Sequence, residues 1–387
     1  MPILNRAAEL QDEIAGWRRT LHQTPELNYD VHQTAAFVAE KLKSFGCDEV
    51  VSGIGRTGVV GLIRGTLGAG ATVGLRADMD ALPITEATGK PYASTNPGKM
   101  HACGHDGHTA MLLGAAKYLA ETRNFAGAVA VIFQPAEEGG AGGLAMVEDG
   151  MMDRFGIAQV FGMHNMPGLP VGQFALRPGP IMAATAEFTI TVKGKGGHAA
   201  MPHRAIDPIV VGSQIVTALQ TIASRTIDPI DSVVVTVTKF HGGDAYNVIP
   251  EQIELAGTVR TLKKEVAQAA RERLHAICAG IAGAHGASVT IDYDSNYPVT
   301  FNHAEETVLA GNVAATIAGD GQVHREIQPV MGGEDFSYML EARPGAFIFI
   351  GNGDTANLHH PAYDFNDEAI PHGVSYWVRL AETALAA

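Results

Sequence analysis

The segment MHACGHDGHTAMLLGAAKYLAETRNFAGAVAVIFQPAEEGG, residues 100–140, decides the fold class. Its first half predicts an amphipathic helix, because apolar residues recur at positions 111, 112, 115, 116 and 119. Its second half contains AVAVIF (128–133), which predicts a short apolar strand that runs into the polar cluster QPAEEGG. A helix followed by such a strand is typical of α/β folds.

Three further apolar strands end in polar clusters and extend this pattern along the chain. They are ATVGLR (71–76), AQVFGM (158–163) and GAFIFI (345–350). The first leads to Asp78 and Asp80, the second to His164 and Asn165, and the third to the loop GNGDTANLHH. Ligands of open α/β sheets bind beyond the carboxyl ends of the strands, so we expect these clusters to be neighbours in space.

The segment from about Ala183 to Ser295 has a different pattern. Its strand and helix candidates follow the order β-α-β-β-α-β, which is the ferredoxin-like arrangement. The stretches RPGPIM and SNYPV flank the segment as hinges. We therefore predict that residues 183–295 form a domain inserted into an outer α/β domain made of residues 1–182 and 296–387.

Composition excludes several classes of protein. The chain has 387 residues and a formal net charge of −14, which argues against nucleic-acid or anionic-membrane partners because both require a basic surface. No apolar run approaches the roughly 18 residues of a membrane helix. The first residues, MPILNRAAELQDEIAGWRR, predict an amphipathic helix rather than a signal peptide, so we predict a cytoplasmic protein.

The three cysteines are Cys47, Cys103 and Cys278, an odd and widely spaced set that does not suggest a disulfide framework. Cys47 and Cys278 lie in apolar or helical stretches and are predicted to be small buried residues. Cys103 is different, because it lies two residues from His105 in a glycine-containing turn. Both side chains can reach one ion from such a turn, and thiolate and imidazole suit Zn²⁺ and other borderline divalent metals. His108, at the start of the helix, could reach back to the same ion.

Glu137 and Glu138 are adjacent carboxylates between a strand and two glycines. Side chains on an irregular backbone point in different directions, so one carboxylate can bind metal while the other faces the substrate as a general base. The residues alone leave open which of the two does which.

Further candidate donors follow in other loops. His164 ends a strand in FGMHNMPG, and the pair His359-His360 lies in NLHHPAYDFND. Asp78 or Asp80 could orient a ligand histidine from behind. The stretch GGEDFSYM (332–339) offers Glu334 and Asp335 for the same role or for substrate.

Eight motifs, in order along the chain, resemble those of the M20 metallopeptidases, in the branch of hippurate hydrolases, aminoacylases and auxin-conjugate amidohydrolases. The motifs are RADMDALPI, MHACGHDGH, FQPAEEGGAGG, GMHN, GKGGHAAMPHRAIDP, NVIP, GGEDFSYM and LHHPAYDFND. The resemblance implies a zinc-exopeptidase-type catalytic domain in residues 1–182 and 296–387. It implies a ferredoxin-like lid and dimerisation domain in residues 183–295.

The resemblance also assigns roles to individual residues. It implies a general base at Glu137 and an acidic residue beside the metal at Asp80. It implies metal ligands at Cys103, His105, Glu138, His164 and His359. Other branches have a histidine at the position of Asp78, and Cys103 replaces a bridging carboxylate. One or two ions are therefore expected, zinc or manganese, and cobalt and nickel also suit.

The implied activity is hydrolysis of the amide bond in small N-acylated amino acids, which releases a carboxylic acid and a free amino acid. In the lid motif, His198 is expected to donate a hydrogen bond to the oxyanion of the transition state. Asn247 and Arg260 are candidates for binding the substrate carboxylate. We expect a homodimer through the lid, or a higher oligomer, because the lid's strand order leaves sheet edges open.

Three alternatives remain at this stage. A dipeptidase or carboxypeptidase would use the same metal centre on another substrate. A cysteine hydrolase would use Cys103 as nucleophile with His105 and would need no metal. A ligand-binding or metal-sensing protein could keep the fold without catalysis, although such a protein has no need of a base at Glu137.

Overall fold

The computed structural model describes residues 3–387, and these divide into two compact units. The larger unit contains the residues up to Ile181, Thr300–Gln328 and Asp335–Ala387. The smaller unit contains Met182–Val299 and Pro329–Glu334. The stretch Pro329–Glu334 thus belongs to the smaller unit, whereas the sequence analysis placed it in the outer domain.

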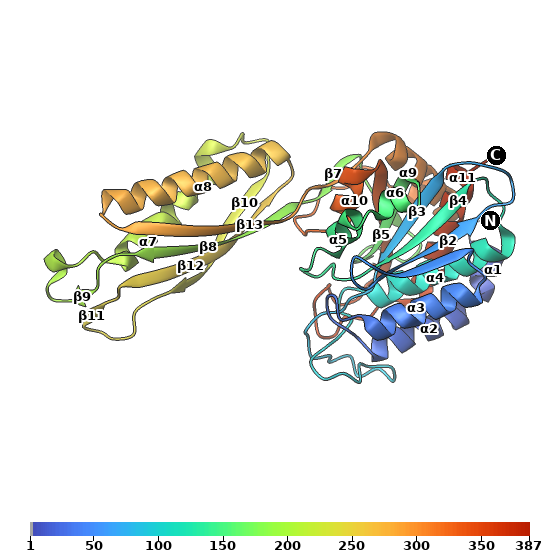
Figure 1. Ribbon diagram of the computed structural model, residues 1–387, viewed down its shortest axis with the longest axis horizontal. Coiled ribbons are helices and arrows are strands. Elements are labelled where there is room, and N and C mark those ends of the chain that lie inside the picture. Colours follow the sequence, from blue (N-terminus) through green and yellow to red (C-terminus); the bar gives the residue numbers. More distant parts are fainter. Residues whose placement is uncertain (1–2) are drawn as a thin grey trace. The chain divides into compact units, whose positions relative to one another are not determined.

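An eight-stranded mixed sheet forms the centre of the larger unit (Figure 1). In order across the sheet its strands are β1 (Glu49–Ile54), β2 (Gly58–Arg64), β4 (Ala128–Gln134), β3 (Thr72–Asp78), β5 (Ile157–Pro167), β16 (Gly345–Gly353), β6 (Phe174–Ala175) and β15 (Val323–His324). The run β4-β3-β5-β16 is parallel throughout. These four strands are the apolar segments that the sequence predicted, and the prediction of an α/β fold is confirmed.

Helices cover this sheet. The longer ones are α2 (Gln11–Gln23), α3 (His32–Ser44), α4 (His105–Thr122), α9 (Ala304–Ala318) and α11 (Ile370–Ala384). The shorter ones are α1 (Asn5–Glu9), α5 (Gly142–Glu148), α6 (Met151–Arg154) and α10 (Ser337–Ala342). Figure 1 shows α2, α3 and α4 together on one side of the sheet. Their apolar side chains share one core with those of α9, α11 and the inward-facing residues of the strands, which fixes the sheet against the helices.

The predicted N-terminal helix is interrupted in the structure. It forms α1 and α2, with Leu10 between them in a helical conformation that ends one helix and starts the next. The first two residues of the predicted helix lie outside the described part of the chain. Among residues 3–387, no helix is both long and apolar enough to cross a membrane.

The smaller unit is a four-stranded antiparallel sheet with two main helices. Its strands, in order across the sheet, are β10 (Val233–His241), β12 (Gln252–Thr261), β8 (Ala184–Lys193) and β13 (Ser288–Tyr297). The helices are α7 (Pro208–Leu219), capped by the Asp207 carboxylate, and α8 (Lys264–Ala284). Alternate residues such as Phe188, Ile190 and Val192 face a core shared with both helices. The predicted order β-α-β-β-α-β is the order observed.

Short elements complete both units. Strand β7 (Gly179–Met182) pairs with β14 (Thr300–Asn302), and β9 (Gly197–His198) pairs with β11 (Val248–Ile249). A π-helical turn, Ile222–Thr226, follows α7.

Candidate metal centre

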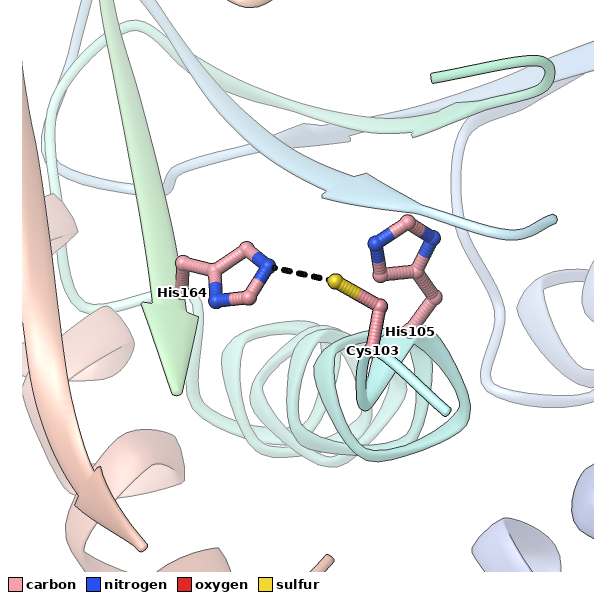
Figure 2. A group of neighbouring side chains, drawn as sticks. All are labelled: Cys103, His105 and His164. Atoms are coloured by element: carbon pink, nitrogen blue, oxygen red, sulfur yellow. Dashed lines mark hydrogen bonds between the residues drawn. The ribbon is translucent and has the colours of Figure 1, made fainter. Parts of the chain in front are cut away.

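A tight turn before helix α4 places Cys103 and His105 beside the end of strand β5. Gly104 adopts a left-handed conformation with φ of 94°, which glycine tolerates because it has no side chain. The turn directs the thiol and the imidazole toward His164 (Figure 2). The Cys103 Sγ atom lies 3.4 Å from Nε2 of His164, and all three side chains are buried. Two sequence-distant segments thus meet at one point.

The Glu137-Glu138 loop lies at the carboxyl end of strand β4, which is separated from β5 by β3 in the sheet. Asp80 fixes the backbone of this loop, because its two carboxylate oxygens accept the N–H groups of Glu137 and Glu138, each at 3.0 Å. Ala136, just before the pair, has a left-handed φ of 55°. The family resemblance implies an acidic residue beside the metal at Asp80, and the contacts of Asp80 also make it a residue that positions the two glutamates.

His359 approaches the cluster from the loop after β16. Its backbone N–H donates to the Ala102 carbonyl at 2.8 Å, and its Nε2 lies 3.5 Å from Oε1 of Glu138. The ring of the adjacent His360 faces its own loop, where Nδ1 accepts the N–H of Ala362. The geometry therefore favours His359 over His360 as a ligand.

Three overlapping groups of donor atoms result. Within each group the ligand atoms lie within 4.8 Å of one another. The groups are Cys103, His105 and His164; Cys103, Glu138 and His359; and His105, Glu137 and Glu138. Because the groups share Cys103, His105 and Glu138, they form one cluster, and every member belongs to the larger unit.

Unpartnered polar atoms indicate that this cluster fits a cation. Within residues 3–387, neither ring nitrogen of the buried His105 has a hydrogen-bond partner, nor does Oε1 of Glu138. Buried polar atoms are normally paired. The carboxylates of Asp80, 3.5 Å from Nδ1 of His105, and of Asp78, 3.7 Å from Nε2, make this surrounding favourable for a cation. Thiolate, imidazole and carboxylate together are the donors that zinc and related divalent metals prefer.

Acidic side chains outnumber basic ones around the cluster, and they shift the pKa values of Cys103 and His105. Burial, and then the charges of Glu138 and Glu137, hold the pKa of the Cys103 thiol well above its usual range. Burial alone would lower the pKa of His105, but Asp78 and Asp80 outweigh burial and raise this pKa to about 10. A positive charge at this point is therefore strongly stabilised.

The ring of His164 is oriented so that its Nε2 atom faces the cluster. Burial holds the pKa of His164 well below its usual range, so the ring is neutral at physiological pH. Its Nδ1 donates to the Asn165 carbonyl at 2.7 Å, which leaves the lone pair of Nε2 on the side of Cys103. This is the tautomer that a metal ligand requires.

His108 is not available as a ligand, although the sequence suggested that it could reach back. Its Nε2 accepts the backbone N–H of Asn165 at 3.0 Å, so the proton lies on Nδ1, which donates to Asp78 at 2.6 Å. Asp78 in turn pairs with the buried Arg76 at 2.7 Å. His108 therefore has no ring nitrogen free for the metal, whereas the Asp78 carboxylate also lies 3.7 Å from Nε2 of His105.

Arg76, which pairs with both Asp78 and Asp335, could not be recognised as their partner from the sequence. The Arg76 guanidinium lies 3.0 Å from Asp335, and Asp335 also accepts from Gln134 and from the N–H of Gly143. Asp335 therefore does not orient a ligand histidine. A signal did exist, because Arg76 ends the apolar segment ATVGLR and continues a buried strand, where a charged side chain needs a buried partner.

The predicted substrate-binding residues lie in the smaller unit. His198 is exposed on β9, directly across from Val248 of β11. Asn247, also exposed, accepts the N–H of Ala199 at its carbonyl, so the structure brings these two predicted residues together.

Arg260 does not join them. It pairs with Thr185 at one end of β8, whereas His198 follows the other end of that strand. At about 3.4 Å per residue, eight residues of strand separate the two ends by roughly 27 Å. The guanidinium of Arg260 donates to the carbonyls of Val259 and Ala186.

Comparison with known proteins identifies the family. The model of the peptidase family M20/M25/M40 matches residues 74–383. The chain is 42% identical to a hippurate hydrolase of Campylobacter jejuni over 381 residues, which are 98% of this chain and 99% of the relative. This chain belongs to the M20 family.

Two other relatives support this conclusion. An N-acetyl-L-cysteine deacetylase of Bacillus subtilis is 43% identical over 93% of this chain and 85% of its own length. The crystal structure of a Bacillus subtilis protein, described as a dinuclear metal binding peptidase from the M20 family, superposes with a TM-score of 0.84. That structure is 37% identical and covers 98% of this chain and 99% of the other.

The M20 protein described here is a metal-dependent amidohydrolase of the aminoacylase and hippurate hydrolase type. The alternative of a metal-free cysteine hydrolase is wrong. It is overturned by the relationship to the M20 amidohydrolases, whose solved relative is described as a dinuclear metal binding peptidase. The alternative of a non-catalytic binding protein is wrong as well.

Proposed function

We propose that this amidohydrolase cleaves N-acyl amino acids into a carboxylic acid and a free amino acid. The similarity to the hippurate hydrolase, which extends over almost the whole of both chains, carries this proposal. A second relative is named as an N-acetyl-L-cysteine deacetylase. The reaction in that name is also hydrolysis of an N-acyl amino acid, with a smaller acyl group. A dipeptidase or carboxypeptidase is the second candidate, because the solved relative is described as a peptidase.

The proposed metal ligands are Cys103, His105, Glu138, His164 and His359. This donor set suits zinc or manganese, and also cobalt or nickel, as one ion or two. A bound divalent metal supplies a Lewis acid that polarises the scissile carbonyl. The proposal is supported by the closeness of these donors, of which Cys103, His105 and His164 are buried and His359 is exposed, and by the Gly104 turn that positions Cys103 and His105.

Glu137 is the proposed general base. It is buried beside the cluster, and its backbone N–H is bound by Asp80, which positions this residue of the loop. In the proposed reaction Glu137 takes a proton from the attacking water and later gives it to the departing amine. A positioned acid–base group of this kind accelerates a reaction by about 10²–10⁴-fold.

The smaller unit is proposed to complete the substrate site. His198 would donate a hydrogen bond to the oxyanion, and Asn247 would bind the substrate carboxylate. Their pairing across β9 and β11 supports a shared role, while the position of Arg260 makes that residue a separate candidate for the carboxylate.

The two units then have different tasks. We propose that residues 1–182 and 296–387 form the zinc-exopeptidase-type catalytic domain, and that residues 183–295 form the ferredoxin-like lid and dimerisation domain of a homodimer or higher oligomer. The exposed edge strand β10 of the smaller sheet supports dimerisation. The cytoplasmic location stays a prediction.

A hydrolysis screen tests the function. Stripped enzyme would be supplied with each divalent metal and offered N-benzoylglycine, N-acetylcysteine and a set of dipeptides at equal concentration. Turnover of N-acyl amino acids at a kcat/KM well above that of every dipeptide supports the proposal. The reverse order would assign the enzyme to the dipeptidases.

A further inference from the structure

Asn165 is a buried residue that has no role in the proposed mechanism. It directly follows His164 near the end of β5, and its side chain is 1% exposed. Its contacts reach three segments of the chain, and each of these segments carries a proposed metal ligand.

The first contact fixes the turn that carries Cys103. The Asn165 Nδ2 atom donates to the Cys103 carbonyl at 2.6 Å. A Cβ atom added to Gly104 would lie 2.3 Å from the same Nδ2, so the turn rests directly on the Asn165 amide. The turn therefore cannot shift without moving Asn165.

The second contact joins Asn165 to the loop that carries His359. The Tyr363 hydroxyl, four residues after His359 and fully buried, donates to Oδ1 of Asn165 at 2.8 Å. This contact also determines the orientation of the amide. The Cys103 carbonyl can only accept, so Nδ2 must face it and Oδ1 must face the tyrosine.

The third contact sets the ring of His164. The Asn165 carbonyl accepts from Nδ1 of His164 at 2.7 Å, which leaves Nε2 unprotonated. The Asn165 backbone is itself braced, because its N–H donates to His108, and His108 is anchored on the Asp78–Arg76 pair. One residue thus links three ligand-bearing segments to a buried ion pair.

We propose that Asn165 is the positioning residue of the metal centre, and that it holds Cys103, His164 and His359 at the separations that the metal requires. The proposal rests on the proposed metal centre. Residues that orient metal ligands typically contribute 10–100-fold to metal affinity. Asn165 is expected to act at this level without touching metal or substrate.

The test measures metal binding rather than turnover. The full chain would be prepared as Asn165→Ala and Asn165→Asp, the second of which keeps the size but loses the donor to Cys103. Metal-free protein would be titrated with Zn²⁺ against a chromophoric chelator, and with Co²⁺ while the thiolate-to-cobalt charge-transfer absorption is recorded. We expect zinc affinity to fall by about 10–100-fold in both variants and the cobalt absorption to weaken or shift.

Asn302 provides a matched control. It is also fully buried in the larger unit, and its side-chain amide also bridges backbone groups, donating to Arg177 and Phe347 and accepting from Phe347. Asn302→Ala should lower thermal stability while zinc affinity and the cobalt spectrum stay as in the wild type. If Asn302→Ala weakens metal binding as much as Asn165→Ala, the effect is one of general destabilisation and the proposal is overturned.

A milder variant covers the case in which the Asn165 variants do not fold. Tyr363→Phe removes a single oxygen atom and should reduce zinc affinity toward the lower end of the same range. Unchanged affinity and spectrum in Tyr363→Phe and in every Asn165 variant that folds would overturn the proposal. The cobalt absorption of wild type and of Cys103→Ser separates this outcome from a failure of the metal centre itself: if Cys103→Ser keeps the absorption, Cys103 is not a ligand.

Discussion

The Sγ atom of Cys103 and the Nε2 atom of His164 lie 3.4 Å apart, although the two residues are 61 positions apart in the sequence. The contact joins the turn before α4 to the end of β5. Two segments that are distant in the sequence therefore meet at the proposed metal site.

Removal of metal should abolish activity. A chelator is expected to reduce hydrolysis to background, and added Mn²⁺, Zn²⁺ or Co²⁺ should restore it, because thiolate, imidazole and carboxylate donors bind such metals. Elemental analysis of the stripped protein accompanies each assay. Full activity in protein shown to contain no metal would exclude the metal mechanism.

The two adjacent glutamates should respond differently to the same substitution. Glu137→Gln should retain metal and fold but lose roughly 10²–10⁴-fold in kcat, because it removes the general base. Glu138→Gln should instead lose metal, since its carboxylate lies 3.5 Å from the His359 ring. Metal content and kcat of both variants decide the matter, and the opposite pattern would reverse the assignment within the pair.

Substrates should require a free carboxylate. The exposed Asn247 beside His198 is the proposed partner of this group. Methyl esters of good N-acyl amino acid substrates should show a strongly raised KM, because the polar groups that receive the carboxylate are left without a partner. Equal kcat/KM for acid and ester would show that the carboxylate is not recognised.

His198 is expected to act in the active site of a partner subunit. It lies in an exposed loop of the smaller unit, and a two-fold axis would join the same sheet edge of two copies. His198→Ala and Glu137→Ala should each be nearly inactive. When the two are mixed and exchange subunits, activity should recover to about one quarter of wild type, because half of the dimers are mixed and each has one intact site.

Mass measurement of the mixture provides the control for subunit exchange. If mixed dimers form and no activity returns, His198 acts within its own chain or has no role. A monomer in solution would contradict the prediction more directly.

The stability of the fold should depend on pH through His22. Its buried ring lies 2.8 Å from Asp106; burial alone would lower the pKa of His22, but Asp106 outweighs burial and raises the pKa to about 9. Because this value lies above the ordinary 6.5, the protonated ring stabilises the folded state fully below about pH 6.5. The contribution, on the order of 3 kcal/mol at most, is lost as pH rises through about 9.

The measurement compares wild type with His22→Asn after metal removal. The free energy of unfolding of wild type should exceed that of the variant at pH 6, and the difference should shrink by pH 10. A difference that stays constant over this range would show that the titration of His22 is not coupled to folding.

Strands and site loops could be predicted from the sequence because both depend on local patterns. Short apolar runs identified β3, β4, β5 and β16, and strand ends in α/β sheets identify where ligands bind. The clustering of Cys103, His105, Glu138, His164 and His359 follows from that rule together with the family resemblance.

The supporting contacts could not be predicted, because they depend on how distant segments pack. No residue close to Asn165 in the sequence indicates that Tyr363 donates a hydrogen bond to it. Likewise, no residue close to His108 indicates that the Asn165 N–H donates to the His108 Nε2 atom. The same holds for Arg260, whose distance from His198 follows from strand register rather than from sequence spacing.

The division of the larger unit into separate chain segments has a consequence for the order of folding. Strand β5 is made before the smaller unit, whereas its parallel neighbour β16 and the ligand His359 are made after it. During synthesis the smaller unit, which is continuous except for Pro329–Glu334, can form its local contacts first. The pairing of β16 with β5 in the larger unit must close a long loop of chain. This slows folding, because the chain loses conformational entropy on loop closure before the distant contacts form. The four proposed ligands that precede the smaller unit are therefore synthesised before the fifth, so the complete proposed site can take up metal only after the insertion has been made.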